Sequence, residues 1–107
     1  MKRKTQVTSV ISYYAILNEL SDRQKEVLVC LKKLGGTANN KMLHEEMKKK
    51  YPRMDISSIT GRMYELRNDK KRKGIIMFDH MGRCPITNET TKFYRTKKWI
   101  QEIQGTL

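Results

Sequence analysis

The chain has few of the residues that would cross-link it or hold it in a membrane. It contains only two cysteines, Cys30 and Cys84, which are too few for a disulfide framework. No apolar run approaches the roughly 20 residues of a membrane-spanning helix. The basic start at residues 1–4 is not followed by the apolar stretch of a signal peptide. These absences favour a reducing compartment, and we expect a cytoplasmic protein.

Groupings typical of a metal site or an active site are also lacking. His44, His80 and the two cysteines are the only soft metal ligands, and none of them forms a Cys-x-x-Cys or His-x-x-x-His pair. The sequence has no glycine-rich phosphate loop and no carboxylate pair in a catalytic motif. We therefore expect no metal, no cofactor, no small-molecule ligand and no enzymatic activity. His44 is expected on a helix surface and His80 in a hairpin.

Acidic residues are the third group in short supply. The 107 residues include 23 Lys and Arg but only 11 Asp and Glu, so the formal net charge is +12. Such a charge says nothing about the fold, but it favours nucleic acid, an anionic membrane surface or an acidic protein as the partner. Hydrophobic residues make up only 37% of the chain, yet they recur in periodic stripes, which predicts a folded domain.

The length fits a single domain, and its first part is predicted to be helical. A helix is expected over residues 9–20. Ser21 and Gln24 match a capping box that opens the next helix, because each side chain can bond the backbone amide of the other. That second helix ends at Gly35 and Gly36, since glycine readily takes the left-handed conformation that follows a helix.

A third helical segment follows the short extended link at residues 37–38. Asn39 or Asn40 is its cap, because either side chain can accept from a free amide at a helix start. Lys48, Lys49 and Lys50 crowd its last turn, where cations complement the helix dipole. A proline at position 52 then stops it.

The most informative segment runs from residue 55 to residue 67, with Asp55 as the expected cap. Apolar residues recur there at a 3-4-3 spacing, which places them on one face of a helix. The residues of this seam are Ile56, Ile59, Met63 and Leu66. The opposite face is small or polar, so the helix could lie close against another surface. Its residues are Ser57, Ser58, Gly61, Glu65 and Asn68, with Arg62 and Tyr64 on the flanks.

The last third of the chain changes from a helix pattern to a strand pattern. Residues 75–81 are β-branched or apolar, and Gly82 allows a turn. Residues 83–87 and 92–96 are then expected as two strands around a polar turn. Pro85 would place the first of these strands at a sheet edge or give it an irregularity.

Three helices followed by a hairpin is the order of a winged helix-turn-helix domain. Residues 20–99 resemble small winged-helix proteins encoded by bacteriophages and their bacterial hosts. The segments that carry the resemblance are residues 20–24, 59–66 and 83–87. The resemblance implies a mostly helical α+β fold, with a three-helix core, a C-terminal β-hairpin wing and extra terminal helices. The junction at residues 68–73 is longer than in such relatives.

This organisation divides the chain into three parts. Residues 1–20 form a basic arm and helix, residues 21–98 the winged helix-turn-helix domain, and residues 99–107 a tail or short helix. Some aromatic and apolar residues fall outside the winged-helix core; they are Tyr13, Tyr14, Trp99 and Ile103. Such residues either pair between subunits, giving a homodimer that suits a palindromic site, or cover the core of the monomer.

The expected function is sequence-specific binding of double-stranded DNA by a phage or bacterial transcriptional regulator. The helix at 55–67 would enter the major groove, surrounding cations would neutralise phosphates, and the wing would contact the minor groove or backbone. Arg62 could reach a guanine edge or a phosphate, and Lys92 is placed near the wing tip. The residues expected at the DNA are Ser57, Ser58, Thr60, Gly61, Arg62, Tyr64, Asn68, Lys70, Lys71, Arg72, Lys73, Thr90, Thr91 and Lys92.

Two other functions stay open. A winged-helix module that binds a host or replication protein would form a salt-insensitive complex, with DNA affinity no greater than weak charge attraction. A protein that binds structured RNA would prefer duplex RNA to duplex DNA in competition, because the deep, narrow A-form groove excludes a helix. If the chain is phage-encoded, the host-cell cytoplasm is where it would act.

Overall fold

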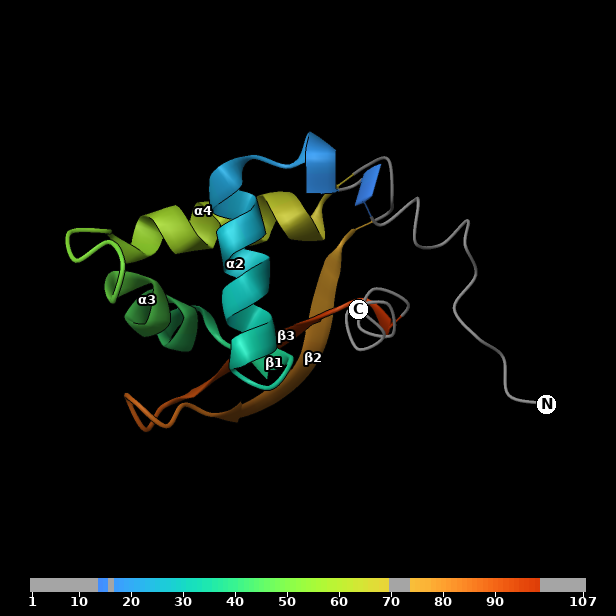
Figure 1. The fold of residues 1–107 in the computed structure, drawn as a ribbon. Coiled ribbons are helices and arrows are strands. Elements are labelled where there is room, and N and C mark those ends of the chain that lie inside the picture. Colours follow the sequence, from blue (N-terminus) through green and yellow to red (C-terminus); the bar gives the residue numbers. More distant parts are fainter. Residues whose placement is uncertain (1–13, 16, 70–73, 99–107) are drawn as a thin grey trace.

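The computed structural model describes residues 14–15, 17–69 and 74–98, and within them the chain is an α+β protein (Figure 1). The helices are α2 (Asp22–Lys33), α3 (Asn40–Lys48) and α4 (Ile56–Arg67). The strands are β1 (Thr37–Ala38), β2 (Ile76–Arg83) and β3 (Thr90–Thr96). Of the helix expected over residues 9–20, positions 14–15 and 17–19 are helical. The rest of it, and the helix expected near Trp99, lie outside the described residues.

Both ends of α2 are formed by the residues predicted to form them. The Ser21 hydroxyl accepts from the Gln24 amide at 3.2 Å, and the Gln24 side chain accepts from the Ser21 amide at 2.9 Å. At the other end, Gly35 and Gly36 have φ angles of 98° and 93°. The Gly36 amide donates to the Leu31 carbonyl at 2.9 Å, which is the bond of a Schellman motif. The capping box and the glycine stop are therefore confirmed.

The start of α3 is capped by Asn39, whose Oδ1 accepts from the Met42 amide at 2.8 Å. The prediction that His44 lies on a helix surface is wrong, because the side chain is buried. Its Nε2 donates to the Met54 carbonyl oxygen at 2.6 Å. This bond ties α3 to the turn that leads into α4.

The apolar seam of α4 is one residue shorter than predicted. Ile59, Met63 and Leu66 are buried, but Ile56 is 43% exposed. Ile56 is the first residue of the helix, so it lies beyond the end of the core that buries Ile59 and Met63. Asp55 takes the extended N-cap conformation without a side-chain capping bond. Ile56 therefore belongs to the surface of α4 and not to the core.

The sheet has the strand order β1-β3-β2, with both pairs antiparallel. The short link between α2 and α3 is thus a strand, β1, on one side of β3. On the other side, β2 and β3 form a hairpin whose register runs from Ile76 opposite Thr96 to Arg83 opposite Thr90. A β-bulge at Asp79 interrupts this register. The long strand β2 is consequently an edge of the sheet.

The hairpin turns later in the chain than predicted. Gly82 lies within β2, where a Cβ atom would come within 3.0 Å of the His80 ring and 3.1 Å of the Phe93 ring. These two rings stack with their centroids 4.8 Å apart. The glycine therefore makes room for ring packing, and the prediction that it forms a turn is wrong.

The strand predicted over residues 83–87 is also wrong. Arg83 ends β2, and residues 84–89 form the turn of the hairpin, with Pro85 inside it. The following strand begins at Thr90, two residues earlier than predicted. Proline suits the turn because its fixed φ matches turn geometry.

The chain returns from α4 to the sheet through a close backbone approach at Gly74. The Ile75 amide donates to the Leu66 carbonyl at 2.8 Å. Gly74 has a φ of 95°, and a Cβ atom there would lie 2.8 Å from the Arg67 carbonyl oxygen. Only glycine fits such a position without a backbone shift.

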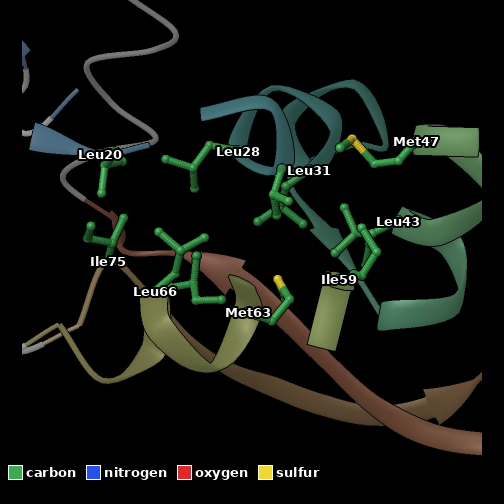
Figure 2. Close-up of a cluster of buried hydrophobic side chains, with 12 residues drawn as sticks. Leu20, Leu28, Leu31, Leu43, Met47, Ile59, Met63, Leu66 and Ile75 are labelled. Carbon is green, nitrogen blue, oxygen red and sulfur yellow. The ribbon is translucent and has the colours of Figure 1, made fainter. Parts of the chain in front are cut away.

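The core lies between the three helices and the sheet (Figure 2). Side chains from α2, α3 and α4 converge there with the residues that begin β2, and Leu20 closes one end. Its members are Leu20, Val27, Leu28, Leu31, Ala38, Leu43, Met47, Ile59, Met63, Leu66, Ile75 and Ile76. Because α4 contributes three of them, the position of its outer side is determined by this core.

Two isoleucines of α4 provide a test of these faces. Ile59→Ala should reduce the free energy of unfolding by about 2–5 kcal/mol, because it leaves a cavity in the core. Ile56→Ala should reduce it by less than about 1 kcal/mol, because Ile56 is at the surface. Urea denaturation of both variants measures the difference. Equal losses for the two substitutions would show that the helix faces are assigned wrongly.

Candidate nucleic-acid interface

The side of α4 that points away from the core is the surface expected to meet nucleic acid. At about 100° per residue, four residues form a row opposite the buried seam. We call this row the outer stripe; it consists of Ser57, Gly61, Tyr64 and Asn68. Tyr64 is 60% exposed, and Ser57 and Asn68 are exposed as well. A Cβ atom at Gly61 would meet no neighbouring atom of the described chain within 4 Å. The outer stripe is therefore open, and it is least bulky at Gly61, which has no side chain.

Arg62 lies on the flank of α4 that faces α2. Its Nε and Nη2 donate to the two carboxylate oxygens of Glu65 at 2.9 and 2.8 Å. The Gln24 side chain donates to the same carboxylate at 2.8 Å. These bonds raise the pKa of the Arg62 guanidinium and lower the pKa of Glu65. Arg62 must therefore give up a bidentate partner before it can bind a guanine or a phosphate.

Two other polar groups of α4 are engaged with the backbone of the same helix. The Thr60 hydroxyl donates to the Ile56 carbonyl at 3.1 Å, and the Asn68 amide nitrogen donates to the Tyr64 carbonyl at 2.8 Å. Thr60 is exposed, and this bond leaves its methyl group free to meet a ligand. By contrast, the hydroxyls of Ser57 and Ser58 have no hydrogen-bond partner in the described part of the chain. Few of the predicted base-reading groups are therefore free.

The opposite flank of α4 is joined to the hairpin by stacked side chains. The Arg67 guanidinium lies 4.8 Å from the centroid of the Tyr94 ring and 5.9 Å from that of Tyr64. Phe78 of β2 meets Tyr94 edge to face, with the centroids 6.4 Å apart. Cation–π contacts of this kind restrain the side chains that make them. The exposed Tyr64 ring therefore lies beside a cation that is itself held on the sheet.

The structure places Thr90, Thr91 and Lys92 in β3 and not at the tip of the hairpin. They pair with the last three residues of β2, so the predicted position of Lys92 near the tip is wrong. The Thr91 hydroxyl accepts from the Asn39 amide nitrogen at 2.9 Å. Lys92 is exposed and has no ion pair within the described ranges. The end of the hairpin is thus fastened to the start of α3.

Cys84 lies at the beginning of the hairpin turn and is fully buried. Burial alone would raise the pKa of its thiol. Hydrogen bonds from the hydroxyl and amide of Thr87, from the Asn39 side chain and from the Ile86 amide outweigh this effect and lower the pKa to about 7. The surroundings of this thiol therefore favour its ionised form.

The predicted basic surface is partly ion-paired. Each lysine of the run at 48–50 lies within 3.2 Å of a carboxylate: Lys48 with Glu45, Lys49 with Glu46 and Lys50 with Glu26. Surface pairs of this kind contribute little to stability, so phosphate can replace the carboxylates. Arg53, Lys92 and Lys98 have no ion pair among the described residues. Lys70, Lys71, Arg72 and Lys73 lie outside that set.

A hollow of about 670 Å³ opens beside the start of α4. It lies between α2, the turn from α3 to α4, and the first two turns of α4. Arg53 lines it together with Ser58, Arg62 and Arg23. Arg23 lies over the Tyr51 ring at 4.0 Å. The hollow is continuous with the α2-facing flank of α4 and adds positive charge to it.

Several other features of the described residues bear on ligands and cross-links. No three His, Cys, Asp or Glu side chains among them are grouped closely enough to hold a metal ion. Cys30 and Cys84 are both free thiols. His80 lies in the hairpin as predicted, with its Nδ1 2.6 Å from Asp79. Within the same residues, no helix is both long enough and apolar enough to cross a membrane.

Sequence reasoning missed three residues that shape this surface. Ile56 was assigned to the core because its spacing fits the seam. Arg67 lies three residues after Tyr64 on the helix, which is a spacing that signals contact, but its second partner, Tyr94, comes from a distant strand. Asn39 was predicted only as a cap, because nothing in the sequence indicates that its side chain also bonds to Thr91 in the hairpin.

Comparison of the sequence and fold with known proteins identifies no relative of this chain. No protein-family model matches the chain, and no curated protein or solved structure matches it either.

The lowered pKa of Cys84 predicts a pH-dependent stability. The folded thiol, with a pKa of about 7, releases its proton before the unfolded thiol, which keeps the ordinary cysteine pKa of 9.0. Between these values the unfolded state binds more protons, so stability should rise with pH. In urea denaturation from pH 6 to pH 9, the free energy of unfolding of the wild type should therefore increase relative to that of Cys84→Ser as pH increases. Parallel profiles for the two proteins would exclude a thiolate in the turn.

Proposed function

We propose that this protein is a winged helix-turn-helix protein that binds double-stranded DNA through α4, and that it serves as a phage or bacterial transcriptional regulator. The observation that carries the proposal is the outer stripe of α4. Ser57, Tyr64 and Asn68 are exposed there, and Gly61 between them has no side chain and open space above it. A helix with such a face can lie deep in a B-DNA major groove, which is about 12 Å wide.

The order of elements supports the proposal. Strand β1 separates α2 from α3, α4 follows α3, and the hairpin of β2 and β3 follows α4. The central strand of the sheet is β3, with the short β1 on one side and β2 on the other. A winged-helix domain has this arrangement, and in it α3 and α4 would form the helix-turn-helix. His44 would then hold the turn between them.

Charge supports the same partner. The formal net charge is +12, and Arg53 and Lys92 carry exposed cations without ion pairs in the described residues. Contacts to about six phosphates would make log affinity fall with log salt at a slope of roughly −5. In this account Arg62 would exchange Glu65 for a phosphate, and Glu65 would keep the Gln24 side chain as its hydrogen-bond partner.

One observation favours a second function, the binding of a protein. The edge strand β2 exposes Met77, Phe78 and Met81. An unpaired strand with apolar side chains is a template for another strand. A complex made in this way would be insensitive to salt, and the protein would show no duplex affinity beyond weak charge attraction. Titration with duplex DNA at several salt concentrations therefore separates the two functions.

Two substitutions at one position test the DNA proposal. Gly61→Ala should bind a selected duplex nearly as wild type does and should stabilise α4 by up to about 1 kcal/mol. Gly61→Leu should keep the fold but weaken binding at least tenfold, because its side chain would stand in the open stripe. Fluorescence titration measures affinity, and circular dichroism measures folding.

The selected duplex comes from a random DNA pool, and duplex RNA serves as a competitor. Wild-type affinity for Gly61→Leu would exclude α4 as the reading element. Stronger competition by duplex RNA than by duplex DNA would favour structured RNA instead.

A further inference from the structure

The hairpin-facing flank of the outer stripe carries a row of apolar groups. Ile56, Thr60 and Tyr64 are spaced four residues apart, so they follow one another along α4 over about 12 Å. Ile56 is 43% exposed and Tyr64 is 60% exposed. The hydroxyl of Thr60 is bound to the Ile56 carbonyl at 3.1 Å, which leaves its methyl group for a ligand. We call these three residues the apolar row.

The polar groups that usually read purines are occupied on this helix. Guanine is read by Arg or Lys through two parallel bonds, and adenine by Asn or Gln in the same way. Arg62 already makes its two bonds to Glu65. The Asn68 amide nitrogen is bound to the Tyr64 carbonyl at 2.8 Å. Apart from the free hydroxyls of Ser57 and Ser58, what α4 offers to base edges without rearrangement is therefore apolar.

Thymine is the base that such a surface fits. Its C5-methyl group is the apolar feature of the major-groove edge of the four standard bases. Successive base pairs rise by about 3.4 Å, so the apolar row spans three to four of them. Arg67, which lies between the Tyr64 and Tyr94 rings, restrains Tyr64 at one end of the row.

We propose that the apolar row of Ile56, Thr60 and Tyr64 contacts thymine methyl groups in the major groove and that these contacts determine sequence preference. The inference rests on the DNA binding proposed above. It assigns specificity to methyl recognition by the hairpin-facing flank and leaves phosphate binding to the cations. Arg62 then contributes affinity without contributing base preference.

Replacement of thymine by deoxyuridine tests the inference, because it removes the methyl group and keeps every hydrogen-bonding group of the base. A duplex selected from a random DNA pool is synthesised with deoxyuridine at one thymine position at a time. Each contacted methyl should be worth about fourfold in affinity, as expected for one buried carbon group. Positions outside the contacted stretch should show no change.

Protein variants locate the contact. Ile56→Ser and Tyr64→Ser should each bring the thymine-to-deoxyuridine affinity ratio at one position close to one. Val29→Ser is the matched control, because Val29 is an apolar residue of α2 that is 58% exposed. That variant and Arg62→Ala should keep the wild-type ratio. Circular dichroism confirms that every variant is folded.

The outcomes separate this inference from the proposed function. Tight duplex binding with equal affinity for thymine and deoxyuridine at every position would overturn the inference and leave DNA binding intact. Loss of the ratio in Arg62→Ala, but not in Ile56→Ser or Tyr64→Ser, would overturn it as well, because the reading group would then lie on the α2-facing flank. Failure of the wild type to bind any duplex would overturn both.

Discussion

The side chain of Asn39 joins the helical part of this protein to its hairpin. Its oxygen accepts from the Met42 amide and so caps α3, and its nitrogen donates to the Thr91 hydroxyl in β3. The residue is 2% exposed, so water cannot easily replace these partners. A buried amide whose oxygen and nitrogen are both bonded in this way specifies one arrangement of the elements around it. The hairpin turn, the start of α3 and the short strand β1 all meet there.

A second connection positions α4 relative to the same hairpin. The buried residues of α4 hold it on the core, and the chain then returns to the sheet through the close approach at Gly74. Arg67 adds a contact on the outside of the molecule, because its guanidinium lies over rings from both α4 and β3. The proposed reading surface is therefore bordered on one flank by the sheet and on the other by α2. Its two flanks differ in chemistry: one carries the Arg62–Glu65 pair, and the other is apolar.

Local signals in the sequence predicted most of the helical part. The capping box at Ser21, the stop at Gly35 and Gly36 and three of the four seam residues of α4 were all found, because each depends on residues within one or two turns. Ile56 was misassigned because periodicity cannot show where a core ends along a helix. His44 and Gly82 were misassigned because their roles depend on Met54 and on the stacked rings of His80 and Phe93, which are partners that the chain brings in by folding.

The candidate site shows the same division between local and distant information. Its location on α4 follows from the buried seam, so the outward position of Ser57, Gly61 and Asn68 could be predicted, whereas Tyr64 was expected on a flank. The state of its polar groups could not, because Arg62 is bound by Glu65 only when the two side chains adopt one particular pair of rotamers. A list of residue types shows which groups could bind a base, whereas the bonds within the protein show which of them are free.

The openness of the outer stripe has a consequence for how this protein can change over generations. Ser57 and Tyr64 lie on the side of α4 away from the core, and surface substitutions of this kind usually change stability by less than about 0.5 kcal/mol. Three buried residues, Ile59, Met63 and Leu66, hold the helix in place. Mutations could therefore alter what α4 binds without loss of the fold. The fold and the binding preference can diverge independently, so a lineage could acquire new targets by single substitutions.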